Sequence, residues 1–164
     1  MPTPTSPPRP LADLFNEQGD VPQAITQERR ALALCEQLPD PRDRAISHNN
    51  LATYLRRIGT PSALTESSRH QLAALIYQLV AGVGQDLQTS LGNYARAFRR
   101  AQAAGTPLPV HHVAELLADT AFRPLDDWLR QRQADVADVQ AKVDQALEMA
   151  RQTALARQAA LGHQ

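Results

Sequence analysis

The sequence predicts an all-α protein, and three observations lead to this prediction. Hydrophobic residues make up 43% of the 164 residues but aromatic residues only 4%, so the core must consist largely of Ala and Leu, which favour helices. Five of the twelve prolines lie between Pro2 and Pro10, which leaves few helix breakers elsewhere. No segment shows the alternating Val, Ile and Thr pattern that is typical of strands.

Seven helices joined by short turns are expected after Pro10. Apolar residues recur at helical spacing between breakers, and Gly19, Gly59 and Gly105 stand where three of the helices should end. The expected helices cover approximately residues 11–18, 20–38, 40–58, 60–81, 85–104, 110–121 and 126–161.

The helix starts carry a recognisable pattern of a capping side chain followed by proline. Asp20 and Thr60 are expected to accept backbone N–H groups of the helices that follow them, and Thr106-Pro107 repeats the pattern. Residues 126–161 contain neither Gly nor Pro, so a single long helix is expected there.

Three regions follow from these elements. Residues 1–10 are a Pro-rich arm with nothing to bury, expected to be disordered. Residues 11–125 hold the helical hairpins, and residues 126–164 hold a long helix that caps them. The apolar stripe of that helix consists of Leu129, Val136, Val139, Val143, Ala146, Leu147 and Ala150. The heptad-like steps 129, 136, 143 and 150 also fit a pairing seam, so a homodimer through residues 126–161 is the alternative.

Several residues recur at an interval of forty positions. They are Leu11-Ala12, Leu51-Ala52 and Leu91-Gly92, together with the pairs Tyr54 and Tyr94, Arg56 and Arg96, and Gly19 and Gly59. A Leu followed by a small residue permits close packing of a partner helix, and a glycine eight residues later ends the helix. The interval indicates an internal repeat.

These residues resemble the tetratricopeptide repeat family, whose motif has a Leu-small pair, a Gly-Asp turn and spaced alanines in the second helix. The stretch 11–34 matches best, with Gly19-Asp20 at the turn and Ala24 and Ala31 in the second helix. In the second unit Leu64 and Gln71 replace the alanines. The interval exceeds the usual length of about 34, as in the long-helix variety found in large bacterial and signalling repeat proteins.

The resemblance covers about residues 11–122. It implies a right-handed superhelical stack of antiparallel helix hairpins, with a concave groove that binds a peptide or partner helix. The groove residues that it implies are Asn49, Asn50, Thr53, Arg56, Arg57, Thr89, Asn93 and Arg96. Chaperone-tail binding is not expected, because Asp13, Asp86 and Ser90 depart from the carboxylate clamp of the chaperone adaptors.

Charge and composition argue against other classes of protein. The chain has 17 basic and 17 acidic residues, without the basic excess typical of nucleic-acid binding. No apolar run approaches the length of a membrane span, and no secretory signal is visible, so a cytoplasmic protein is expected.

The sequence also contains no recognisable constellation for catalysis. His112 and Glu115 lie one helical turn apart but lack further ligands for a metal, and no His/Asp arrangement is readable beside Cys35. We therefore expect a protein-binding scaffold that is not an enzyme and needs no cofactor. The alternatives are a module that self-associates through the terminal helix and an enzyme that uses Cys35 or the pair His111 and His112.

Overall fold

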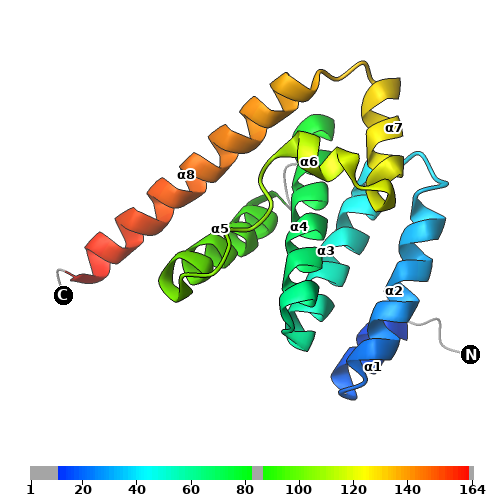
Figure 1. The fold of residues 1–164 in the computed structure, drawn as a ribbon, viewed down its shortest axis with the longest axis horizontal. Helices are drawn as coiled ribbons and strands as arrows, with labels where there is room; N and C mark the ends of the chain where they lie inside the picture. The colour runs from blue at the N-terminus through cyan, green and yellow to red at the C-terminus, as the bar shows by residue number, and fades with distance from the viewer. Residues whose placement is uncertain (1–10, 83–86, 163–164) are drawn as a thin grey trace, which may run out of the picture.

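The computed structural model describes residues 11–82 and 87–162, and all regular elements in these ranges are helices (Figure 1). The all-α prediction is therefore confirmed. The helices are α1 (Leu11–Glu17), α2 (Val21–Cys35), α3 (Pro41–Ile58), α4 (Pro61–Ala81), α5 (Leu87–Ala104), α6 (Val113–Ala118), the 3-10 helix η1 (Thr120–Phe122), α7 (Arg123–Gln131) and α8 (Val136–Gly162). The expected disordered arm, residues 1–10, lies outside the described residues.

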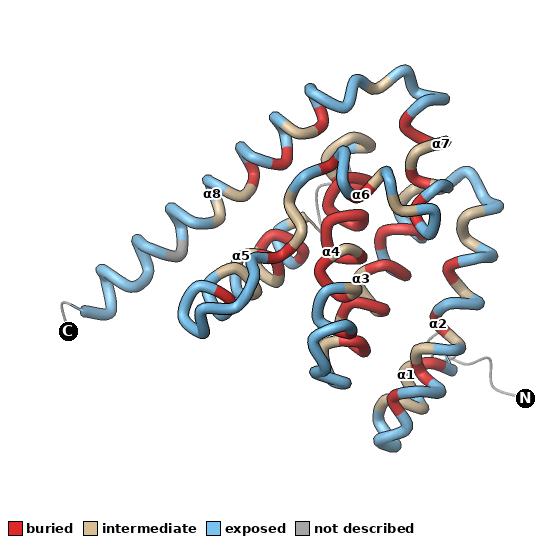
Figure 2. Tube along the Cα trace, viewed as in Figure 1, coloured by how far each residue is buried: buried red, intermediate tan, exposed pale blue. Residues whose placement is uncertain are grey.

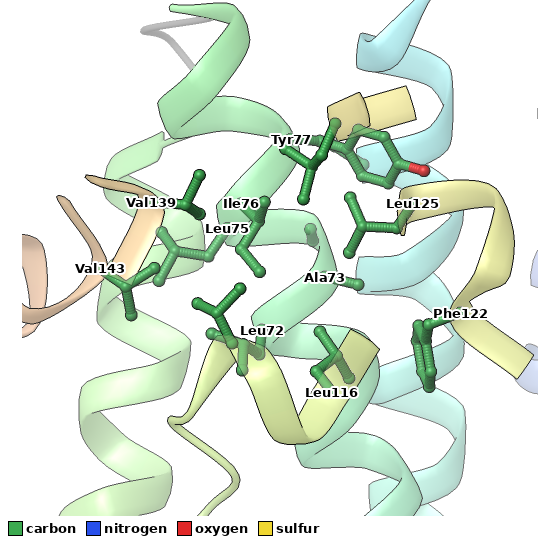
Figure 3. Packing of buried hydrophobic residues seen from close by; sticks show 14 of the residues in the cluster. Leu72, Ala73, Leu75, Ile76, Tyr77, Leu116, Phe122, Leu125, Val139 and Val143 are labelled. Atoms are coloured by element: carbon green, nitrogen blue, oxygen red, sulfur yellow. The ribbon is translucent and has the colours of Figure 1, made fainter. Parts of the chain in front are cut away.

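Helix α4 is the centre of the molecule. All residues from Gln71 to Gln78 are buried, whereas a helix at a protein surface buries only one stripe. It packs against α3, α5, α6 and α8. Figure 3 shows its side chains Leu72, Leu75 and Ile76 among residues of α6, α7 and α8. The main core therefore joins elements from both halves of the chain.

The N-terminal end has a smaller core of its own. Its buried members are Ala12, Val21, Ala24 and Tyr54, with Phe15 and Ile25 partly buried beside them. Helices α1 and α2 occupy one end of the molecule, as Figure 1 shows. Leu34 of α2 is 65% exposed, because this helix packs against α3 through only a narrow stripe.

Contacts between alternate helices repeat at a fixed sequence interval. Three hydrogen-bonded pairs have partners 41 residues apart, and they are Asp13–Tyr54 and Asn16–Arg57 between α1 and α3, and Asn49–Ser90 between α3 and α5. The forty-residue interval of the sequence thus lies close to the spacing of the residues that join α1 to α3 and α3 to α5.

Two of the predicted caps are confirmed. Asp20 accepts the N–H of Gln23 at 3.3 Å, and Thr60 accepts the N–H of Ala63 at 3.3 Å. Each satisfies a backbone donor that the first turn of a helix leaves without a partner. Local sequence is sufficient to specify these helix starts.

The third predicted cap, Thr106-Pro107, is wrong. No helix follows it, and Thr106 donates instead to the carbonyl of Ala101 at 3.4 Å. Helix α6 begins only at Val113, and its first N–H donates to Gln140 of α8 at 2.7 Å. A side chain from a distant helix therefore provides the cap, which explains why the predicted helix 110–121 is shorter than expected.

The prediction of one helix over residues 126–161 is also wrong. Helix α7 ends at Gln131, and α8 begins at Val136. Gln133 has φ +55, the N–H of Ala134 donates to the carbonyl of Leu129, and both features are typical of a helix end normally made by glycine. Asp135 then accepts the N–H of Ala137 at 3.0 Å and starts α8.

This break divides the predicted heptad seam. Leu129 lies in α7, and Val143 of α8 is fully buried in the main core. Val136, at the start of α8, is 39% exposed. These residues therefore do not form one pairing seam, although self-association through other residues of α8 remains a prediction.

Candidate functional site

The eight residues predicted to line a groove lie on α3 and α5. Asn49, Asn50, Thr53, Arg56 and Arg57 belong to α3, and Thr89, Asn93 and Arg96 belong to α5. The repeat hypothesis assigns these two helices to successive hairpins. The assignment of the eight residues to partner binding remains a prediction.

Three of the predicted residues on α3 connect helices within the protein. Asn49 donates to Ser90 of α5 at 2.9 Å, and Asn50 donates to the buried Glu28 of α2 at 3.5 Å. Arg57 donates to Asn16 of α1. A partner could engage these groups only by replacing existing hydrogen bonds, so they are better suited to holding the hairpins in register.

The arginines of this surface have a different environment. Burial, followed by repulsion from the guanidinium groups of Arg100 and Arg96 on α5, lowers the pKa of Arg56 on α3 below its ordinary value. No ion pair joins any of the three to a carboxylate within the described part of the chain. Arg96 donates to Asn93, also on α5. We refer to Arg56, Arg96 and Arg100 as the arginine cluster.

A groove between α5 and α8 adjoins this cluster. It encloses about 590 Å³. Its apolar floor includes Leu91, Ala95, Ala146 and Ala150, and its cationic residues are Arg96, Arg99, Lys142 and Arg157. Among the residues that the structure describes, no carboxylate lines it. The sequence did not predict this groove, because the groove depends on the direction that α8 takes after the break at Gln133.

A second hollow, of about 670 Å³, lies beside a buried histidine pair. The Nδ1 atoms of His48 and His70 are 2.8 Å apart, and His70 Nε2 lies 3.6 Å from Glu66 Oε1. The His70 side chain, and Arg29 at 2.7 Å from Glu66, lower the pKa of the Glu66 carboxyl to about 2. Glu66 therefore has its partners, Arg29 and His70, within the protein, and this group of side chains is well suited to a structural role.

The residues considered for catalysis do not assemble into a site. Within residues 11–82 and 87–162, no group of three or more His, Cys, Asp or Glu side chains is placed to hold a metal. His112 and Glu115 are both exposed at the start of α6. Cys35 is half-buried, with its Sγ 3.8 Å from the Ser47 hydroxyl.

Most aromatic residues of the described chain pack in the core. Phe98 is partly buried, and the buried rings are Tyr54, Tyr77, Tyr94, Phe122 and Trp128. Tyr94 donates to the carbonyl of Val110, which fixes the extended segment before α6. None of these five rings is available as an exposed anchor for a partner.

Comparison with known proteins adds no relatives. No family model matches the chain, and no curated protein or solved structure matches it significantly. The resemblance to tetratricopeptide repeats therefore depends on the residues quoted above and remains a prediction. Of the helices described, none is both long enough and apolar enough to cross a bilayer.

Proposed function

We propose that this protein is a binding scaffold that takes up an acidic segment of a partner protein across α3 and α5. The observation that carries the proposal is the arginine cluster, in which Arg100 and Arg96 of α5 repel the charge of Arg56 on α3 and none of the three pairs with a carboxylate among the described residues. Like charges at short range cost free energy, and an anionic ligand removes that cost.

Arginine is suited to this task. Its planar guanidinium donates two parallel hydrogen bonds to one carboxylate, which gives orientation as well as attraction. Arg96 and Arg100 are exposed, and Arg56 is half-buried between them and α3. A segment with two or three Asp or Glu residues matches a cluster of this size.

The regular spacing of the hairpins supports a repeat scaffold. Hydrogen-bonded partners 41 residues apart join α1 to α3 and α3 to α5, which supports equivalent positions for these three helices. In a stack of repeats, each hairpin contributes the same helix to one shared surface. We extend this to a superhelical arrangement of the tetratricopeptide type, with the arginine cluster on its binding face.

The test is affinity capture from cells that express the protein, with Arg56→Gln and Arg100→Gln combined. Glutamine is shorter than arginine but keeps a polar side chain and removes the repulsion between like charges, so the variant should fold at least as stably as the wild type. A partner held by the wild type and lost by the variant supports the proposal. Arg123→Gln, an exposed position on α7, is the matched control and should retain the partner.

Two outcomes would count against this function. Retention of every partner by the double variant would mean that the arginine cluster does not bind them. Loss of the partner by the Arg123→Gln control as well would indicate nonspecific attraction by positive charge. Asn50 is avoided in this test because its hydrogen bond to Glu28 makes any substitution structurally ambiguous.

A further inference from the structure

The groove between α5 and α8 has an apolar floor and positively charged side chains along its edges. Small residues from both helices, Gly92 and Ala95 on α5 and Ala146 and Ala150 on α8, widen the space between them. Arg96, Arg99, Lys142 and Arg157 complete the lining. None of these four cations forms an ion pair with a carboxylate of the described chain.

The C-terminal half of α8 leaves this floor uncovered. Figure 2 shows buried positions only in the half of α8 nearest to α7. Met149 and Leu161, which both line the groove, are 61% and 69% exposed. Exposed apolar side chains along the wall of a groove are a feature of interaction sites.

We propose that this groove binds an acidic amphipathic helix of a partner protein, with the apolar face of that helix between α5 and α8. The inference rests on the proposed function and specifies the form of the acidic segment. Arg96 belongs to both the arginine cluster and the groove, so the two surfaces are continuous.

The length of the groove favours a helix. On α8 the lining extends from Lys142 to Leu161, which corresponds to about 28 Å along the helix axis. A helix of about 18 residues has the same length. Small residues at the floor let two helix axes approach to the usual packing distance of about 8–10 Å.

The distribution of charge argues against a small amphiphile. Lys142 and Arg157 are separated by about 22 Å along α8, and Arg96 and Arg99 lie on the opposite wall. A fatty acid or similar ligand has one anionic head, which could reach only one of these places. Several carboxylates along a helix can reach all of them, as in other helix-in-groove complexes.

Charge also argues against a second copy of this chain. A symmetric contact would place the α8 groove residues of each copy against those of the other. Those residues include Lys142 and Arg157 but no carboxylate, so the contact would bring like charges together. An acidic partner avoids this repulsion.

The experiment uses the full chain and a synthetic helical peptide of about 18 residues, with Leu and Ala on one face and Glu at its flanks. Binding is measured by fluorescence anisotropy in low salt and again at about 300 mM NaCl. We expect the peptide to bind in low salt and to bind about tenfold more weakly at the higher salt concentration. A peptide with Lys in place of Glu should also bind about tenfold more weakly than the Glu peptide. The same peptide with a proline placed in its middle, which breaks the helix, should not bind.

Substitutions in the protein locate the site. Lys142→Glu with Arg157→Glu, and separately Ala150→Trp, should each weaken binding about tenfold, the first by charge and the second by filling the groove. Arg151→Glu is the matched control, because Arg151 is exposed on α8 outside the lining and lies 3.9 Å from Glu148. Its affinity should equal that of the wild type. Circular dichroism confirms that all the variants fold.

The outcomes separate this inference from the proposed function. If only Arg56→Gln with Arg100→Gln weakens binding of the peptide, the groove inference is overturned and the proposed function stands. If the peptide does not bind at all, the groove inference fails, whereas capture of an acidic partner that depends on Arg56 and Arg100 would preserve the proposed function. Competition by laurate, or a dimer that the groove substitutions disrupt, would assign the groove to another occupant.

Discussion

The Nδ1 atoms of His48 and His70 lie 2.8 Å apart in the interior, where one ring donates the hydrogen and the other accepts it. His48 also stacks at 5.8 Å on Phe122, with 23° between the rings. Burial, followed by the nearby His70 and Arg44, holds the pKa of His48 well below its ordinary value of 6.5. The folded protein therefore keeps His48 neutral.

The first prediction follows from this lowered pKa. The unfolded chain takes up a proton at His48 near pH 6.5, but the folded protein does so only at lower pH. The stability that the neutral His48 contributes is therefore complete above pH 6.5. It is lost as the pH falls through the pKa of His48 in the folded protein. One such group changes the free energy of unfolding by at most about 1.4 kcal/mol per pH unit. Denaturant unfolding between about pH 7.5 and 5.5 measures the slope.

The control for this effect is His48→Gln. The slope of stability against pH in this window should decrease, because the variant removes the proton that only the unfolded chain takes up. An unchanged slope would assign the pH dependence to other groups. Glu66 does not interfere, because its pKa is lowered to about 2 from 4.5 and its contribution is lost only below this window.

Arg44 supports a second prediction. Its guanidinium, buried at the start of α3, donates to the carbonyls of Cys35 at 3.3 Å, Glu36 at 2.8 Å and Leu38 at 3.0 Å, and so satisfies the end of α2. Arg44→Ala should lower the free energy of unfolding by about 2–4 kcal/mol, because it leaves these acceptors without their donor. Arg44→Lys should recover only part of the loss. Arg30→Ala, on the exposed side of α2, should change stability by less than about 0.5 kcal/mol in the same urea titration.

Leu51 tests the register of the predicted repeat. It is 0% exposed, so Leu51→Ala should cost about 2–5 kcal/mol of stability. Leu34→Ala is the matched control; its side chain is 65% exposed, and its effect should stay within about 0.5 kcal/mol. Equal effects of the two substitutions in urea unfolding would contradict the burial described here.

The turn between α7 and α8 supports a fourth prediction. Gln133 has φ +55, a region that glycine adopts without the steric cost of a side chain. Gln133→Gly should therefore raise the free energy of unfolding by about 0.5–1 kcal/mol. Gly105→Gln, at φ +66 in a similar helix end, makes the reverse change and should lower it by a similar amount. Thermal unfolding of the two variants and the wild type measures both changes in stability.

The sequence predicted most of the helices because their ends depend on local chemistry. Asp20 and Thr60 accept N–H groups from residues only three positions away, and Gly59 ends α3 as expected. The forty-residue interval likewise lies close to the spacing of the hydrogen-bonded partners that join α1 to α3 and α3 to α5. These features need no knowledge of the tertiary structure.

The remaining errors concern contacts that the local sequence does not contain. Gln140 of α8 caps α6 from 27 residues away, and His48 meets His70 across two helices. Gln133 adopts a glycine-like conformation without being glycine, so the end of α7 had no signal in the composition. The α5–α8 groove follows from that turn. Of the predicted groove residues, Asn49, Asn50 and Arg57 have partners within the chain that only the packing reveals.

The central position of α4 has a consequence for how the chain is made. A repeat array can usually lose a terminal unit without exposing the rest. Here α8 contributes Val139 and Val143 to the core around Leu75 and Ile76, so that core stays incomplete until the last quarter of the chain has been synthesised. A nascent chain that ends after α4 would expose one of its most apolar helices to water. Fragments of the N-terminal half should therefore aggregate, and the main core should unfold as one cooperative unit.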